Sequence, residues 1–286
     1  MFKAAVLMRK AMLIGSLTNN IETMVNVTKS DIEKLERPDY ELQKTILPTE
    51  IKAAKAFRCL ELGITPVRFV IMEKRLMFLK YILDEGTETM IYKVYEEQRK
   101  TSKKGDFVDL VKSDLNEMEI KFEDKDIQEM SKRQWKKLIN QKIKEKALNY
   151  LVAENDKKEK TRHIKFNKLE MSNYLNENKS TSLSKLIFSI RSGTLDIKCL
   201  NKWNYGDNLC VMCELKAETL EHMMICPEYG EKEENGWREI YGNNPKKQIN
   251  IAKMIEKRME IRKKQNKRPA KTHPMAPILR LIVVET

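Results

Sequence analysis

An apolar stripe at helical spacing constrains the fold of this chain more than any other feature. The stripe consists of Phe69, Met72, Leu76, Leu79 and Leu83. Further apolar residues widen it around the circumference, and a helix that is apolar over so much of its surface belongs in a core. Proline is favoured at the start of a helix and glycine just after its end. We therefore expect a central, buried helix between Pro66 and Gly86.

The scarcity of glycine and proline extends this expectation to the whole chain. Only 9 glycines and 8 prolines occur in 286 residues, of which 41% are hydrophobic and 34% charged. An all-β chain needs many turns, and turns need glycine and proline. The apolar share is large enough to build a core, so wholesale disorder is not expected. The chain is predicted to be mainly α-helical.

Local signals place further helices. Thr28 and Asp31 form a capping box that should start a helix, and Pro38 should kink or split that helix. Gly63 should end a second helix over residues 50–62. The remaining helices are expected over residues 90–98, 107–118, 127–152 and 183–190.

The net charge of +13 predicts an anionic partner. Phosphate backbones attract such a surface, and counterion release supplies affinity, so RNA or DNA is the expected partner. A generally basic, solvated surface is the alternative, and a nuclear localisation signal is a further alternative for the C-terminal stretch. Trp135 and Trp203 are expected to pack in the core, with base stacking as the alternative. The candidate nucleic-acid contacts are Lys132, Arg133, Lys136, Lys137, Arg262, Lys263, Lys264, Lys267 and Arg268.

Three of the five cysteines and one of the three histidines fall in one short segment. Two residues separate Cys210 from Cys213, His222 follows after eight more, and Cys226 follows after three. Zinc prefers thiolate and imidazole ligands in a closed tetrahedron, and three cysteines with one histidine are a recognised structural set. The last gap places His222 and Cys226 one turn apart on a helix, facing the same way. We predict one structural zinc ion, with no open position for a catalytic water.

The other cysteines leave one alternative open. Cys59 is expected in the core, whereas Cys199 is an alternative for one of the metal ligands. An odd number of cysteines does not suit a secreted disulfide framework, so the chain is expected inside the cell, in the nucleus or cytoplasm. A targeting peptide over residues 1–17 is the alternative. No apolar run is long enough to span a membrane, and no membrane partner is expected.

In this order, the motifs resemble the C-terminal part of a non-LTR (LINE-type) retrotransposon reverse transcriptase. The stretch from Asn26 to Glu36 is similar to a helix of the family's thumb. The similarity covers about residues 10–230, and the helical stretches gain specificity because the cysteine–histidine knuckle follows them. The other matching stretches are residues 60–68, 74–79, 94–98, 105–106 and 190–193, Tyr205, and the knuckle of Cys210, Cys213, His222 and Cys226.

The resemblance implies a thumb that grips a template–primer duplex and a linker and knuckle that contact RNA or target DNA. The chain departs from the family at the polymerase centre. Polymerases hold two magnesium ions with paired aspartates, and no Asp-Asp pair occurs in this sequence. The palm and fingers are missing, so we expect no catalytic residues and no enzyme activity. A decayed copy of an element is an alternative origin.

We therefore expect a mainly α protein: a multi-helix thumb-like region, then a helical linker and a small CCHC zinc knuckle. The expected segments are a thumb-like region over 1–125, a basic helix and linker over 126–182, a helix with the knuckle over 183–230, and a basic, partly disordered tail over 231–286. The expected function is non-catalytic nucleic-acid binding. Two alternatives remain: a reverse-transcriptase part that works only with a palm domain in trans, and a zinc-dependent protein-interaction module.

Overall fold

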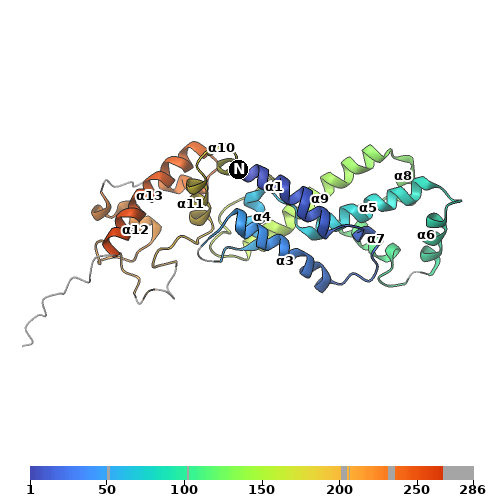
Figure 1. Cartoon of the computed structure of the whole chain (residues 1–286), viewed down its shortest axis with the longest axis horizontal. Coiled ribbons are helices and arrows are strands. Elements are labelled where there is room, and N and C mark those ends of the chain that lie inside the picture. Colours follow the sequence, from blue (N-terminus) through green and yellow to red (C-terminus); the bar gives the residue numbers. More distant parts are fainter. Residues whose placement is uncertain (50–51, 102, 201–204, 206, 231–235, 267–286) are drawn as a thin grey trace, which may run out of the picture. The chain divides into compact units, whose positions relative to one another are not determined.

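The structure, a computed structural model, describes residues 1–49, 52–101, 103–200, 205, 207–230 and 236–266. This part of the chain is mainly helical, as predicted, and contains no strand (Figure 1). Leu209 and Ala217 form an isolated antiparallel bridge. No helix within the described ranges has the length and apolar character needed to cross a membrane.

The helices have the following bounds. In chain order they are α1 Phe2–Met8, a π-helix Arg9–Ile14, α2 Gly15–Leu17, α3 Lys29–Ile46, α4 Lys55–Leu62, α5 Val67–Glu85, α6 Met90–Thr101, α7 Phe107–Glu117, α8 Asp124–Glu129, α9 Lys132–Asp156, α10 Asn173–Glu177, α11 Thr181–Arg191, α12 Leu220–Ile225 and α13 Pro245–Asn266. Short 3-10 turns cover Ile21–Thr23, Pro227–Tyr229 and Trp237–Tyr241.

The chain divides into two compact units. The first comprises residues 1–196 and 238–252, and the second comprises residues 197–237 and 253–286. The boundaries of the four segments expected from the sequence stay a prediction.

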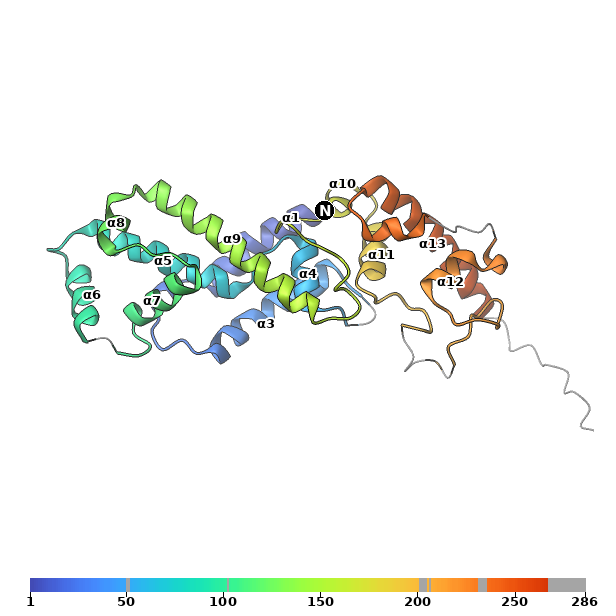
Figure 2. The ribbon, with the colours of Figure 1, turned by 180° about the vertical axis from the view of Figure 1, so that it is seen from behind.

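Helix α5 is the centre of a hydrophobic core, as its apolar stripe predicted. Leu76 and Leu79 are fully buried, and residues of α6, α7, α8 and α9 pack around them. Figures 1 and 2 show α9 running alongside α5. The indole of Trp135 on α9 is buried and donates a hydrogen bond of 2.9 Å to the carbonyl oxygen of Leu76. Trp135 is therefore a core residue, as expected.

Three boundaries differ from those expected. Pro38 does not split α3, which runs unbroken from the Thr28 cap. The helix that Gly63 ends begins only at Lys55, while Gly63 has the expected left-handed conformation (φ +65°). The single helix expected over 127–152 is two helices, because Ser131 caps α9 in a capping box with Gln134. The capping box satisfies free backbone N–H groups at the start of α9. A new helix therefore begins after Ser131, although the apolar periodicity of the sequence continues from α8 into α9.

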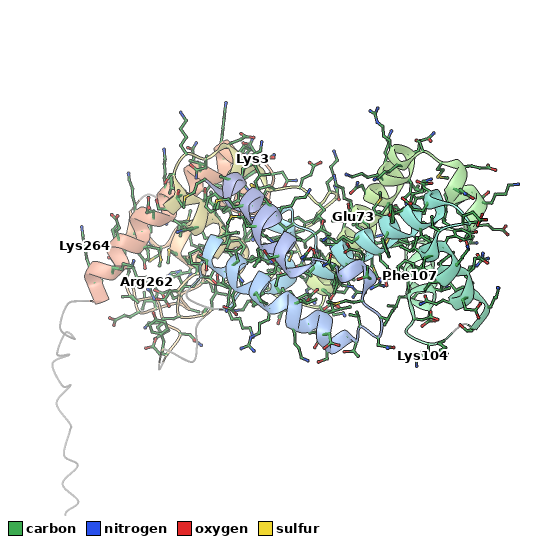
Figure 3. The ribbon with its side chains drawn as sticks, turned by 45° about the vertical axis from the view of Figure 1, so that its right-hand side comes forward. Lys3, Glu73, Lys104, Phe107, Arg262 and Lys264 are labelled. Atoms are coloured by element: carbon green, nitrogen blue, oxygen red, sulfur yellow. The ribbon has the colours of Figure 1, made fainter. Side chains whose placement is uncertain are left out.

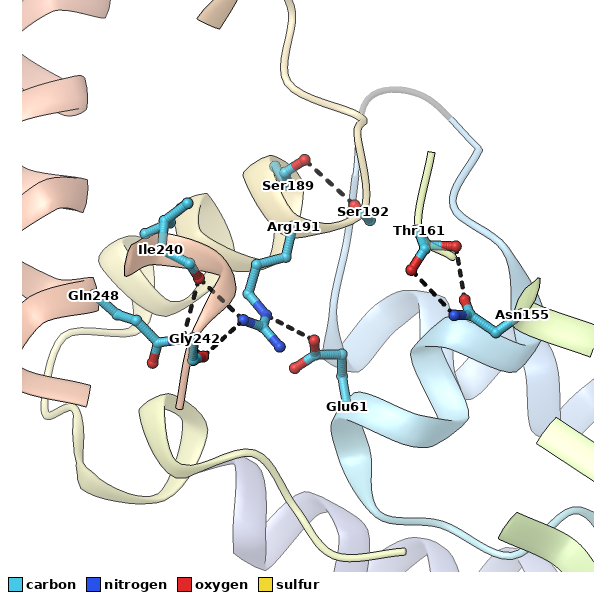
Figure 4. Close-up of polar contacts among 9 residues, drawn as sticks. All are labelled: Glu61, Asn155, Thr161, Ser189, Arg191, Ser192, Ile240, Gly242 and Gln248. Carbon is cyan, nitrogen blue, oxygen red and sulfur yellow. Dashed lines mark hydrogen bonds and ion pairs between the residues drawn. The ribbon is translucent and has the colours of Figure 1, made fainter. Parts of the chain in front are cut away.

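A buried ion pair ties together three parts of the first unit (Figure 4). Nε of Arg191 on α11 lies 2.8 Å from Oε1 of Glu61 on α4, and the two side chains are 2% and 0% exposed. Nη1 of Arg191 also donates to the carbonyl oxygens of Ile240 and Gly242, each at 3.0 Å. The amide of Gln248 donates to the same two carbonyls. These contacts fix the segment before α13 against α4 and α11.

Candidate metal centre and basic surfaces

A tight turn positions the first two candidate ligands. The N–H of Cys210 donates to the carbonyl oxygen of Lys216 at 2.7 Å, and the N–H of Glu214 donates back to Cys210 at 2.9 Å. Glu214 has a left-handed backbone conformation (φ +56°), which lets the chain reverse directly after Cys213. The turn therefore presents both sulfurs from one side.

Helix α12 positions the other two ligands. The hydroxyl of Thr219 accepts a hydrogen bond of 2.9 Å from the N–H of His222 and so caps the helix. Cys226 follows the last residue of α12, and its N–H donates to the carbonyl oxygen of His222 at 2.8 Å. His222 and Cys226 are therefore one helical turn apart on the same face.

The four side chains converge on one point. Their ligand atoms all lie within 4.8 Å of one another, and Sγ of Cys213 is 3.3 Å from Nε2 of His222. Sulfurs about 2.3 Å from a central ion stand roughly 3.8 Å apart in a tetrahedron, so the cluster has the right size. Cys210, Cys226 and His222 are buried. Cys210, Cys213, His222 and Cys226 can therefore hold one metal ion.

Burial disfavours the charged thiolate form of two of the thiols unless a cation is bound beside them. Burial raises the pKa of Cys226 to about 11 and also raises the pKa of Cys210. Burial also acts on Cys213, but hydrogen bonds from the N–H groups of Leu215 and Lys216 lower the pKa of its thiol overall. Thiolates are the metal-binding form, and a bound cation compensates their charge. Desolvation lowers the pKa of His222, which keeps the imidazole neutral and able to bind.

The remaining cysteines lie outside this cluster. Cys59 is buried in α4, its thiol lies 3.4 Å from the side-chain oxygen of Gln43, and burial raises its pKa to about 12. Cys59 is thus a core residue, as expected. Cys199 is half-buried and does not belong to the four-residue group. Trp203 lies outside the described residues.

Helix α13 is anchored on the segment that contains the cysteine–histidine cluster through two buried arginines. Nε and Nη2 of Arg262 each donate to Glu218 at 2.9 Å, and Glu218 directly precedes the Thr219 cap. Arg258 donates to the carbonyl oxygen of Met223 within α12. We did not anticipate these contacts from sequence. The spacing of Ile251, Ile255, Arg258 and Arg262 was the signal for a buried helix face.

This anchoring changes the interpretation of the basic C-terminal stretch. Residues 245–266 of the expected tail form α13. Arg262 was a candidate nucleic-acid contact, but it is 2% exposed and bound to Glu218, so its guanidinium is not on the surface. Lys263 and Lys264 are exposed, and Figure 3 labels Lys264 on α13. Lys267 and Arg268 lie outside the described residues.

The candidates on α9 are all on the surface. Lys132, Arg133, Lys136 and Lys137 are exposed. Lys142 and Lys146 of the same helix pair with Glu145 and Glu119. Within the described ranges, none of the four exposed cations takes part in an ion pair. The structure therefore leaves four uncompensated charges within the first two turns of α9.

The comparisons with known proteins identify no relative. No protein-family model, no curated protein and no solved structure matches this chain.

Proposed function

We propose that this protein binds nucleic acid without catalysing a reaction on it, and that it derives from the C-terminal part of a LINE-type reverse transcriptase. The supporting observation is the exposed basic face of α9. Arg133, Lys137 and Lys144 are exposed and follow one another at spacings of four and seven residues, so they lie on one side of the helix. Trp135, Ile139 and Ile143 occupy the opposite, buried side.

Without a bound anion, the placement of these positive charges destabilises α9. The first turn of α9 contains no acidic residue, although the helix dipole favours anions there. Like charges one turn apart, such as Arg133 and Lys137, also repel each other. Phosphates bound along this face remove both penalties and explain why so many cations stand together.

The metal in the knuckle is proposed to be zinc. Three thiolates and one imidazole are typical ligands of structural zinc, whereas hard cations such as Mg²⁺ and Ca²⁺ prefer carboxylate, carbonyl and water oxygens. With Cys210, Cys213, His222 and Cys226 all bound, no position remains for an activated water. Zinc would therefore hold the fold of the knuckle and supply no chemistry to a substrate.

Neutralising the α9 face tests the proposal. We expect the triple variant Arg133→Gln, Lys137→Gln, Lys144→Gln to bind RNA and DNA more weakly. A plot of log affinity against log salt concentration has a negative slope, and its magnitude should decrease by about 2 to 3. Each lost phosphate contact reduces that magnitude by about 0.7 to 0.9. Fluorescence anisotropy with labelled single- and double-stranded oligonucleotides at several salt concentrations measures this slope.

A charge-matched variant controls for the loss of three cations. Lys34, Lys93 and Lys100 are exposed and each stands beside a carboxylate. Their replacement by glutamine should leave the salt slope unchanged. An equal slope in the wild type and the α9 variant would refute the assignment of this face. Affinity with no salt dependence would favour the protein-interaction module instead.

A second function, as part of a reverse transcriptase with its palm in trans, is favoured by one observation. Leu7, Met8 and Met12 are 58%, 61% and 65% exposed on the N-terminal helical segment. With Ala4 and Ala11 they form an apolar face, and contiguous apolar surface marks an interaction site. A palm domain would cover such a face.

Charge substitution on this face tests the second function. If it is correct, primer extension by a separately purified LINE-type fingers–palm fragment should rise when the wild-type chain is added. A Leu7→Glu, Met12→Glu variant should abolish that gain, while a Lys3→Glu, Lys10→Glu variant, on the flank of the same segment, should retain most of it. No gain with the wild type would exclude this function for the fragment used.

A further inference from the structure

The first unit contains a cavity that the proposed function does not use. It has a volume of about 750 Å³ and lies where α3, the start of α4 and the end of α9 meet. Cavities of this size are typical of sites for small organic ligands. Ala54, Ala56 and Thr161 contribute small side chains to its lining, and Tyr40 and Tyr150 contribute aromatic rings. The space is thus larger than one phosphate group needs.

Lysines outnumber carboxylates around this cavity. The lysines are Lys52, Lys55, Lys157, Lys158 and Lys160, and the carboxylates are Glu36, Glu154 and Glu159. Two of the lysines are used in ion pairs, Lys55 with Glu36 and Lys157 with Glu154. In the part of the chain that the structure describes, Lys52 and Lys158 have no carboxylate partner. The lining therefore has a local excess of positive charge.

A buried arginine lies behind the lining of the cavity, against Tyr40. Arg58 is 1% exposed; its Nη2 donates a hydrogen bond of 3.3 Å to the hydroxyl of Thr49, and its Nε and Nη1 atoms have no hydrogen-bond partner. Its guanidinium lies 5.6 Å from the ring centre of Tyr40, which lines the cavity. A buried cation without a counter-charge is unfavourable. An anion bound in the cavity would reduce this penalty.

The start of α4 faces the same space. Ala54 is the N-cap residue of this eight-residue helix and provides no side-chain cap. Ala54, Lys55 and Ala56 line the cavity. The first N–H groups of an uncapped helix lack intrahelical partners and suit an oxyanion.

From the cavity and its unpaired lysines, we propose that this cavity binds a nucleotide. The phosphate lies against the start of α4, between Lys52 and Lys158, and the base lies beside the ring of Tyr40 or Tyr150. The phosphate supplies the negative charge that Lys52 and Lys158 lack, and the base fills the remaining volume. The nucleotide is either free or the phosphorylated end of a strand, and this site is independent of the α9 face.

Calorimetric titration of the full chain tests the site with AMP, ATP and adenosine. We expect AMP and ATP to bind and adenosine to bind at least tenfold more weakly. The Lys52→Glu, Lys158→Glu variant should weaken nucleotide binding at least tenfold. A Lys112→Glu, Lys125→Glu variant carries the same charge change on exposed residues of α7 and α8 and should bind like the wild type. Circular dichroism checks that both variants are folded.

Two further experiments identify the source of the nucleotide and show whether this site binds independently of the α9 face. A tetranucleotide with a 5′-phosphate that binds tenfold more tightly than its 5′-hydroxyl form assigns the cavity to strand ends, and equal binding of the two assigns it to free nucleotides. The Arg133→Gln, Lys137→Gln, Lys144→Gln variant should still bind AMP. The proposal is overturned if no nucleotide binds, if adenosine equals AMP, or if both lysine variants weaken binding alike.

Discussion

Removal of the metal is expected to unfold the knuckle, residues 207–230, while the helical core of the first unit stays folded. The turn at Cys213 and the short helix α12 bring the four candidate ligands together. Structural zinc contributes on the order of 10 to 16 kcal/mol to the folding of zinc-finger peptides. The core around α5 contains no metal ligand and does not depend on the ion. Hydrogen exchange before and after chelation measures the loss of protection at Cys210, Glu214 and Cys226.

Metal analysis of tag-free protein compares the zinc content of the wild type with that of a variant that lacks one candidate ligand. Wild-type protein should contain one zinc ion per chain, and Cys226→Ser should contain none. The control is Cys199→Ser, which lies outside the cluster and should retain the ion; loss of zinc there would make Cys199 a ligand. Zinc-free protein with protected knuckle amides would refute the metal centre and weaken the proposed origin.

The second large effect is expected at the ion pair between Glu61 and Arg191. Replacing Glu61 by glutamine leaves the guanidinium of Arg191 buried without its counter-charge. Breaking a buried pair in this way typically costs about 3 to 5 kcal/mol. Because Arg191 also holds the carbonyls of Ile240 and Gly242, the segment before α13 should lose hydrogen-exchange protection as well. Urea unfolding followed by circular dichroism measures the free energy of unfolding.

A surface pair provides the control for this variant. Glu88 is 93% exposed and lies 3.6 Å from Lys93. Exposed pairs contribute about 0 to 1 kcal/mol, so Glu88→Gln should leave the unfolding midpoint nearly unchanged. If both substitutions change the free energy of unfolding by equally small amounts, the buried pair does not hold the segment before α13 in place.

The sequence by itself determined the helical class, the central helix and the four residues of the cysteine–histidine cluster. These features are local, because an apolar period, a cap or a short cysteine spacing acts through residues one or two turns apart. The stripe from Phe69 to Leu83 predicted α5, and Thr28 with Asp31 predicted the start of α3. The gaps between Cys210, Cys213, His222 and Cys226 predicted a cluster that the structure brings within 4.8 Å.

Only the tertiary structure decided which charges are on the surface and which are buried. Arg262 and Lys264 stand two residues apart in the same basic stretch, but Arg262 is bound to Glu218 and Lys264 is exposed. Glu61 meets Arg191 across 130 residues, and no local pattern announces such a partner. The cavity beside Arg58 likewise forms from segments distant in sequence. A charged side chain is stable in the interior only with a partner or a ligand. The tertiary fold determines which residue becomes that partner.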